Sequence, residues 1–473
     1  MTVLASDDRL ARILEFGLAA LLFLAPLPFG AVVPAGRMAL ELGSGALLLL
    51  WLVRAASRPT PLPSALATIG LAGLLLLGTL QAAPLGSTMV RVLSPLSMRV
   101  RTESAPSGLA IEAEQRILAT DPASLDPPPA LSLDPPATAS AVRTGAALAA
   151  LFFVACTVAA TRGGGGIALA LLTSAAFQAL YGIATLASTD PHIWHLPKKY
   201  YLDCATGTLV NRNHFAGLLA ACLPCGLALV VSGVPSAPPS WGVRRRIVAA
   251  FDRRGSRAWF LTLLLVLASA GLLLSFSRAG IGLAAGAVAL TILGLRPTTS
   301  RSRLLGVALA AALALVPVAQ IGAERWAERF AQSGSDFSAR GGRATVWQDT
   351  LRMIGAAPLV GIGFGAFGAA YPTFRSPDVR AKYDHAHNDA LQVVAEGGLV
   401  AALLLIALLL PLAREIPRSL RGGRGPIAVG IAAGLTAMLG HALIDFGFHI
   451  PSNAAVAAAL AGALSGFGWN DPV

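Results

Sequence analysis

The chain alternates between long, uninterrupted apolar runs and shorter polar connections. Runs such as 10–29, 38–53, 65–83 and 259–276 carry little or no charge. Each is about 16 to 20 residues long, which is the length a helix needs to cross a hydrocarbon core of roughly 30 Å. Because these runs are continuously apolar and do not alternate, they favour membrane helices over the strands of a membrane barrel.

The same pattern repeats along the whole chain and predicts about twelve membrane spans. The expected spans are 10–29, 38–53, 65–83, 142–161, 167–187, 214–234, 259–276, 279–295, 304–322, 388–412, 427–446 and 451–468. We therefore expect an all-α polytopic membrane protein with a large external loop between the ninth and tenth spans.

Composition and charge placement support this class. Hydrophobic residues make up 55% of the chain and charged residues 13%, which is too little charge to cover a soluble fold. The net charge of +12 does not indicate a nucleic-acid-binding protein, because the arginines stand at helix ends and in short connections. The arginine-rich connection 235–258 is expected in the cytoplasm by the positive-inside rule. Alternating outward from it places both termini in the cytoplasm as well.

This topology divides the chain into five segments. They are the first three spans (1–83), a Pro-rich external loop (84–141), spans four to nine (142–322), a large external loop (323–387) and the last three spans (388–473). The Pro-rich loop is expected to be extended or mobile, since proline blocks regular pairing and little apolar surface is available for packing.

The clearest candidate for chemistry is a His-Ala-His-Asn-Asp sequence where the large external loop meets the tenth span. The unperturbed pKa of histidine lies near neutrality, so His385 or His387 could accept a proton from a hydroxyl nucleophile. A second interpretation is interfacial histidines beside a helix that Asn388 or Asp389 caps. A third is a metal site that includes Asp384, although no other cluster in the sequence completes it.

Two arginines stand at predicted external ends of spans. Arg278 follows Ser277 between spans seven and eight, where a charge is costly unless it reaches water or an anion. It could extend to the interface, or its planar guanidinium could bind a phosphate. Arg212 precedes the sixth span between Asn211 and Asn213, which can cap a helix whose N-terminal dipole favours an anion. An arginine at such a helix start is also commonly structural.

Further polar residues are weaker candidates. His441, Asp445 and His449 recur every four residues, which predicts one face of the eleventh span and its external end. We expect a structural hydrogen-bond network there, or a supporting role for the site. Arg340 and Arg343 lie in the large external loop, where exposed arginines need no special explanation.

Four segments, in this order, resemble the O-antigen ligase and polysaccharide polymerase superfamily of bacterial membrane glycosyltransferases. They are Asn-Arg-Asn-His-Phe-Ala-Gly at 211–217, Ser-Phe-Ser-Arg-Ala-Gly at 275–280, Pro-Leu-Val-Gly-Ile-Gly at 358–363, and His387-Asn388 followed by Glu-Gly-Gly at 396–398. The resemblance covers roughly residues 200–468 and implies a GT-C-like fold in the bacterial inner membrane.

The resemblance also implies an activity. A relative of this kind takes a glycan from an undecaprenyl diphosphate carrier at the periplasmic face and inverts the anomeric centre, with no metal or other cofactor. By motif match, His387 is the expected general base, and Arg278 and Arg212 are expected to contact the diphosphate. The residues expected to bind substrate are Asn211, Asn213, His214, Ser277, Arg340, Arg343, His385 and Asn388.

The acceptor stays open between two possibilities. A ligase delivers the glycan to a lipid A-core sugar, whereas a polymerase joins it to a second carrier-linked repeat unit. The expected partners are therefore these lipid-linked glycans and the bilayer, and no nucleic acid. A transporter or lipid flippase is the alternative from another class, but it should show internal repeats and charges or broken helices near the bilayer midplane. A structural assembly scaffold is a further alternative.

Overall fold

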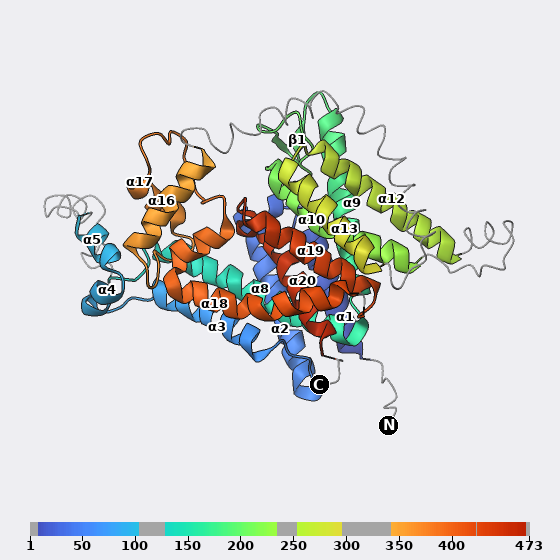
Figure 1. The fold of residues 1–473 in the computed structure, drawn as a ribbon, viewed down its shortest axis with the longest axis horizontal. Coiled ribbons are helices and arrows are strands. Elements are labelled where there is room, and N and C mark those ends of the chain that lie inside the picture. The colour runs from blue at the N-terminus through green and yellow to red at the C-terminus, as the bar shows by residue number, and fades with distance from the viewer. Residues whose placement is uncertain (1–7, 104–127, 234–252, 296–341, 422, 470–473) are drawn as a thin grey trace. The chain divides into compact units, whose positions relative to one another are not determined.

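The protein is built almost entirely of helices. The computed structural model describes residues 8–103, 128–233, 253–295, 342–421 and 423–469 (Figure 1). The α-helices are α1 (Arg9–Leu24), α2 (Pro34–Ser57), α3 (Ala65–Ala82), α4 (Ser87–Leu93), α5 (Pro95–Glu103), α8 (Pro135–Arg162), α9 (Gly165–Ala187), α10 (Arg212–Gly233), α12 (Arg253–Leu274), α13 (Arg278–Leu295), α16 (Arg343–Ala356), α17 (Phe367–Phe374), α18 (Asp389–Leu420), α19 (Pro426–Ala442) and α20 (Pro451–Phe467). Two 3-10 helices, η1 (Phe29–Ala31) and η2 (Gly447–His449), and an antiparallel pair of short strands, β1 (His192–Ile193) and β2 (Leu196–Pro197), complete the described elements.

Eight helices in the described part of the chain are long and apolar enough to cross a membrane. They are α2, α3, α8, α9, α10, α12, α13 and α18. The shorter helices α1, α19 and α20 coincide with the first and the last two predicted spans, and the predicted span 304–322 lies outside the described residues. The all-α membrane class is thus confirmed, and the number twelve stays a prediction.

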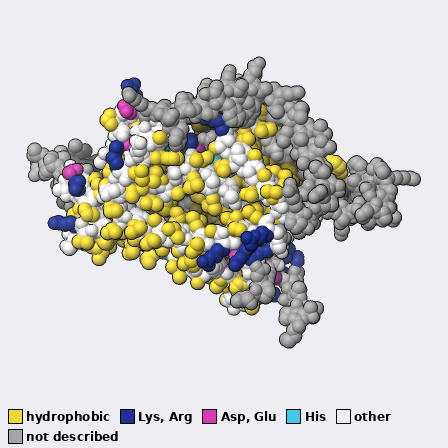
Figure 2. All heavy atoms as spheres, in the orientation of Figure 1, with side chains coloured by type: hydrophobic (Ala, Val, Ile, Leu, Met, Phe, Trp, Pro, Cys, Tyr) yellow, Lys and Arg dark blue, Asp and Glu magenta, His cyan; other side chains and the backbone are white. Residues whose placement is uncertain are grey.

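Many hydrophobic side chains lie on the described part of the face drawn in Figure 2, and Lys and Arg gather there in a few groups. Leu42, Leu49 and Phe16 are among the large apolar side chains left exposed, on helices that the sequence predicts to span the membrane. Such surfaces suit a lipid environment, in which an exposed leucine costs nothing.

The chain forms two compact units. The first comprises 1–65, 146–333 and 410–473, and the second comprises 66–145 and 334–409. In the first unit, α10 packs against α9, α12, α13 and α19, and almost every one of its side chains is buried. Small residues allow this close packing: a Cβ added to Gly280 of α13 would lie 2.4 Å from the Cβ of Ala216 on α10.

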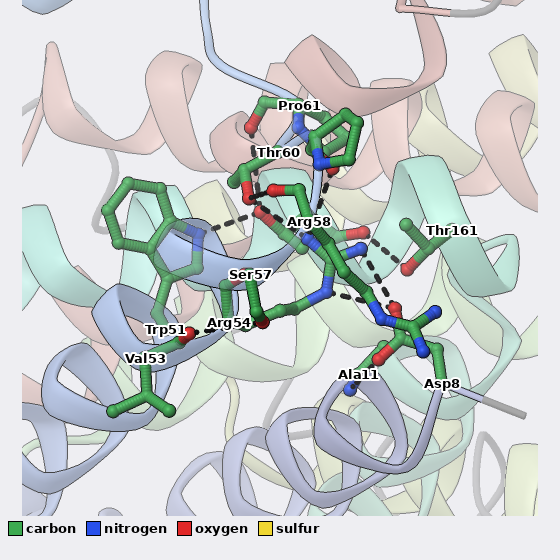
Figure 3. Close-up of polar contacts among 12 residues, drawn as sticks. Asp8, Ala11, Trp51, Val53, Arg54, Ser57, Arg58, Thr60, Pro61 and Thr161 are labelled. Carbon is green, nitrogen blue, oxygen red and sulfur yellow. Dashed lines mark hydrogen bonds and ion pairs between the residues drawn. The ribbon is translucent and has the colours of Figure 1, made fainter.

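A partly buried ion pair ties the start of α1 to the end of α2 in the first unit (Figure 3). Arg54 donates from Nε and Nη2 to Oδ2 of Asp8, at 3.0 and 2.9 Å, and from Nη1 to the hydroxyl of Thr60 at 3.1 Å. Oδ1 of Asp8 accepts from the backbone N–H of Ala11 at 2.9 Å and so caps α1. Burial raises the pKa of Asp8, but the bonds from Ala11 and Arg54 outweigh it, so the pKa lies below its usual value.

In the second unit, α16 and α17 form a core with the first turns of α18. Val346, Met353, Phe367 and Tyr371 are buried together with Ala395 of α18. This core holds the segment that leads from the large loop into α18.

The segment 84–141, expected to be extended or mobile, is partly helical. It contains α4 and α5, and α8 begins within it at Pro135. Asp134 accepts a hydrogen bond from the N–H of Ala137 at 3.0 Å, so this Asp-Pro pair caps a helix and does not break one. The segment has two further Asp-Pro pairs, Asp121-Pro122 and Asp126-Pro127, which lie outside the described residues.

Candidate functional site

The first turns of α10 and α13 lie side by side in the first unit. Asn211 caps α10, because its Oδ1 accepts the N–H of Asn213 at 2.8 Å. Ser277 precedes α13, and its hydroxyl accepts the N–H of Gly280 at 3.4 Å and donates to Oδ1 of Asn213 at 2.9 Å. This last bond joins the two arginine motifs, although they are 64 residues apart in the chain. Two helix N-termini, each beginning with an arginine, therefore stand next to each other.

Arg212 is held by weakly polar partners. Its guanidinium carbon lies 5.3 Å from the centre of the Tyr201 ring, and Nη1 lies 3.8 Å from the sulfur of Cys204. Its Nε is buried and makes no hydrogen bond within the described residues. Burial raises the pKa of the Cys204 thiol, so the thiol does not compete as an anion. The positive charge of Arg212 is thus available to an anionic ligand.

Lys198 is a further cation that the sequence interpretation missed. Its side chain is buried, and Nζ donates to the carbonyl oxygen of Cys204 at 2.7 Å, the single hydrogen bond it makes within the described residues. An ammonium group has three N–H donors. Burial lowers the pKa of Lys198, partly offset by Cys204 and Asp203. Lys198 and Arg212 contact the same residue, Cys204, so the loop before α10 holds two cations close together.

Two hydrogen bonds to backbone carbonyls fix this loop to its surroundings. Trp194 donates from Nε1 to the carbonyl of Leu27 at 2.7 Å, and Ala205 donates from its N–H to the carbonyl of Leu274 at 2.9 Å. The second of these bonds ties the loop to the end of α12, just before the Ser277 turn. Lys198 is therefore part of a constrained structure.

His214, in the first turn of α10, is buried against Phe446 with the two rings edge to face at 4.5 Å. Asn453 donates to its backbone carbonyl at 3.0 Å. Packing accounts for this histidine, and its contact with a substrate stays a prediction.

The four-residue spacing of His441, Asp445 and His449 does not continue along one helix. α19 ends at Ala442, Asp445 lies in the turn that follows, and His449 belongs to η2. The prediction that Asp445 shares a helical face with His441 was wrong, because the helix ends one residue after His441. The N–H of Asp445 donates to the carbonyl of His441 at 3.0 Å and closes that turn.

In the second unit, the His-Ala-His-Asn-Asp sequence forms the start of α18. Asn388 caps this helix, with Oδ1 accepting the N–H of Leu391 at 2.9 Å. The capping interpretation of Asn388 is therefore confirmed, and it leaves the chemistry of the histidines open. His387 has φ of +52°, a left-handed conformation that is uncommon for residues other than glycine. Its ring lies edge to face against Tyr383, with centres 5.6 Å apart.

Two buried side chains of α18, Gln392 and Glu396, hydrogen-bond near the start of this helix. Gln392 accepts the N–H of Ala386 at 3.0 Å, and its Nε2 lies 3.2 Å from Nδ1 of His385. The same Nε2 donates to Oε1 of Glu396 at 2.9 Å, and that oxygen also accepts the N–H of Phe367 at 3.4 Å. The backbone that carries the histidines is thus bonded to the first two turns of the helix.

The Pro-Leu-Val-Gly-Ile-Gly segment packs directly on the Glu-Gly-Gly segment of α18. Gly398 interrupts the helix with φ of +64°, and the N–H of Leu399 donates instead to the carbonyl of Pro358 at 2.8 Å. A Cβ added to Gly361 would lie 2.3 Å from the carbonyl carbon of Glu396. Two of the segments that carry the family resemblance are therefore parts of one contact.

Asp349 is a second residue that the sequence interpretation missed. It is fully buried on α16 and accepts from the hydroxyl of Tyr371 at 2.8 Å, from Ser376 and from Arg352. Burial and this carboxylate raise the pKa of Tyr371. The Tyr371 ring also lies edge to face against Tyr383, 6.1 Å between centres, so these rings connect Asp349 to the surroundings of His387.

The structure brings the predicted site residues together in two groups. Arg212, Asn213, Ser277 and Arg278 meet in the first unit, and the histidine segment lies in the second. Arg343 begins α16 and is half-buried, and Arg340 lies outside the described residues. Convergence of His387 with the arginines stays a prediction. Within the described residues, no group of three or more His, Cys, Asp or Glu side chains is placed to hold a metal ion.

Comparison with known proteins supports the resemblance over part of the chain. Residues 263–406 match a family model described as O-antigen ligase. No curated protein matches the chain. The matched stretch contains the Arg278 turn, the Pro-Leu-Val-Gly-Ile-Gly segment and the histidine segment, whereas the Arg212 segment precedes it. Over residues 263–406 the chain is thus a match to the O-antigen ligase family, as its ordered motifs predict.

Proposed function

We propose that the protein is a membrane glycosyltransferase of the O-antigen ligase or polymerase type. It transfers a glycan from an undecaprenyl diphosphate carrier to an acceptor hydroxyl at the periplasmic face of the inner membrane. The observation that carries the proposal is the pair of adjacent helix N-termini joined by the Ser277–Asn213 hydrogen bond. The family match over 263–406 supports the class of reaction.

The paired helix starts suit a diphosphate. The first turns of two helices present backbone N–H groups and positive dipole ends. Arg212 and Arg278 add guanidinium groups whose donors match phosphate oxygens, and Lys198 adds a third charge beside Arg212. A lipid diphosphate keeps its charged group at the membrane surface, the depth at which we place the start of both helices.

These cations act when the bond from the anomeric carbon to the phosphate oxygen breaks. The bonding electrons leave with the diphosphate, so its negative charge increases in the transition state. Guanidinium groups that are already in position stabilise this charge without reorganising. The acceptor oxygen attacks the opposite face of the sugar, which inverts the anomeric centre, and we assign removal of its proton to His387.

The acceptor is either a lipid A-core sugar or a second carrier-linked repeat unit. Purified protein in nanodiscs, supplied with an undecaprenyl-diphosphate glycan and each acceptor separately, distinguishes a ligase from a polymerase by the product formed. If no new glycosidic bond forms with either acceptor, the proposal is contradicted. Movement of intact donor across the bilayer would favour a transporter instead.

Variants test the assigned residues in the same reaction. His387→Ala should abolish transfer, whereas His195→Ala, which removes an exposed histidine, should leave it unchanged. Arg278→Lys should be strongly impaired because lysine lacks the bidentate fork, with Arg380→Lys on the exposed surface as its control. Near-normal transfer by His387→Ala would remove this residue as the base.

A further inference from the structure

The buried amide of Gln392 stands between the backbone of the two histidines and the carboxylate of Glu396. Gln392 is 1% exposed, and all three of its partners belong to the same unit of the structure. Oε1 accepts from the N–H of Ala386 at 3.0 Å, and Nε2 faces both His385 Nδ1 at 3.2 Å and Glu396 Oε1 at 2.9 Å.

These partners determine which way the amide faces. The backbone N–H of Ala386 can only donate, so it requires the amide oxygen. The carboxylate of Glu396 accepts, so it requires the NH₂ group. The opposite orientation would set two donors together at Ala386 and two oxygens together at Glu396. The donor at Ala386 and the acceptor at Glu396 therefore fix the orientation of the Gln392 amide.

The orientation of Gln392 then determines the proton position on His385. Because the amide nitrogen only donates, Nδ1 of His385 must accept. A neutral imidazole carries one proton, so that proton resides on Nε2. In this tautomer Nδ1 is occupied by Gln392 and Nε2 is a donor, so neither nitrogen can take a proton from an acceptor hydroxyl.

We infer that Gln392 is a positioning residue that holds His385 in the Nε2–H tautomer and leaves the role of general base to His387. The inference rests on the proposed glycosyl transfer only for the role of base. The bond from Ala386 to Gln392 also fixes the backbone directly before His387, which has the left-handed φ of +52°. One amide thus sets the proton position on the first histidine and the backbone position of the second.

The first experiment observes the tautomer directly. The chain has 7 histidines, and ¹⁵N-labelled histidine in detergent-solubilised protein gives separate ring-nitrogen signals for protonated and unprotonated positions. His385→Gln identifies the His385 signals by their loss. We expect the Nε2–H tautomer in the wild type. Gln392→Glu should convert it to Nδ1–H, because a carboxylate accepts where the amide donated.

A matched variant separates this effect from a general change of charge. Gln348→Glu makes the same substitution at an exposed position of α16 and should leave the His385 signals unchanged. A wild-type Nδ1–H tautomer would overturn the inference, as would a His385 tautomer that Gln392→Glu does not alter. This readout does not depend on transferase activity, so it stands even where the proposed function fails.

The second experiment measures transfer. Gln392→Glu should lower kcat about tenfold or more with little change in KM for the donor, a smaller loss than the roughly 10²–10⁴ that a general base contributes. His385→Gln should keep measurable activity, and His387→Gln should lose it. Full loss in His385→Gln with activity retained in His387→Gln would reverse the two roles. Inactive wild-type protein would instead contradict the proposed function.

Discussion

The hydrogen bond between Ser277 and Asn213 offers a direct test of whether the two arginine-bearing helix starts act as one site. Ser277→Ala removes the hydroxyl that donates to Asn213 at 2.9 Å and accepts from Gly280 at 3.4 Å. The Ser277 side chain is 2% exposed, so water does not replace the lost bond at that side. An intramolecular hydrogen bond contributes about 0.5–1.5 kcal/mol net. We take about 1 kcal/mol, since Asn213 is only half-buried.

That free energy corresponds to roughly a fivefold change in an equilibrium constant. If the bond keeps Arg212 and Arg278 at the spacing of a diphosphate, affinity for undecaprenyl diphosphate should fall about fivefold in Ser277→Ala. Asn213→Ala should have the same effect, and the double variant should lose little more. The coupling energy of this cycle is then about 1 kcal/mol.

The assay is titration of undecaprenyl diphosphate into purified protein in nanodiscs, with the unfolding midpoint measured for each variant. Ser269→Ala is the control, because its hydroxyl donates to the carbonyl of Leu265 within α12 itself. Additive losses in the double variant would refute the reasoning. Unchanged affinity in both single variants would show that the bond is structural only.

Three further substitutions test other features of the structure. Lys198→Met should weaken undecaprenyl diphosphate binding about tenfold or more, since a charge-assisted hydrogen bond contributes about 1.5–3 kcal/mol. Lys199→Met, at an exposed position, should not weaken it. Equal losses in the two variants would contradict a role for Lys198 as a third cation at the diphosphate. Gly361→Ala should cost several kcal/mol of folding free energy, because its left-handed φ of +66° alone costs about 1–2 kcal/mol. Gly355→Ala, in a helix where an added Cβ meets nothing within 4 Å, should not cost this much. Thermal unfolding in detergent measures the difference between the two variants. Asp8→Asn should lower the folding free energy by about 1.5–3 kcal/mol at pH 7, because it removes the charged partner in Figure 3. The folded pKa of Asp8 lies below its usual value, so this stabilisation is present above the unfolded pKa and is lost as the pH falls through the folded pKa. A difference between wild type and variant that does not shrink as the pH is lowered would contradict this account.

Much of the helical framework could be predicted from the sequence. Long apolar runs end where polar residues and caps begin, so Arg212 and Arg278 were expected at helix starts, and the structure begins α10 and α13 at these residues. Asn388 as a helix cap follows from the same reasoning. These features depend on neighbours in the chain, which a sequence pattern contains.

Features that depend on distant partners could not be predicted in this way. Lys198 and Lys199 are identical in the sequence, and only the fold buries one of them. Asp349 lies in a helix with polar neighbours, and nothing local indicates that Tyr371 and Ser376 surround it. The bond between Ser277 and Asn213 likewise requires the packing of α13 on α10.

The contacts of Gln81 have a consequence for exchanging parts between relatives. This side chain of α3 donates to the carbonyls of Val360 and Glu396 at 2.6 and 2.8 Å, and its own oxygen accepts the N–H of Phe364 at 3.2 Å. Gln81 therefore satisfies three main-chain groups inside the stretch that matches the family, from a position nearly two hundred residues upstream of it. A chimera that transplants only the matched stretch into another scaffold would lose these three hydrogen bonds, so the graft should include the third helix.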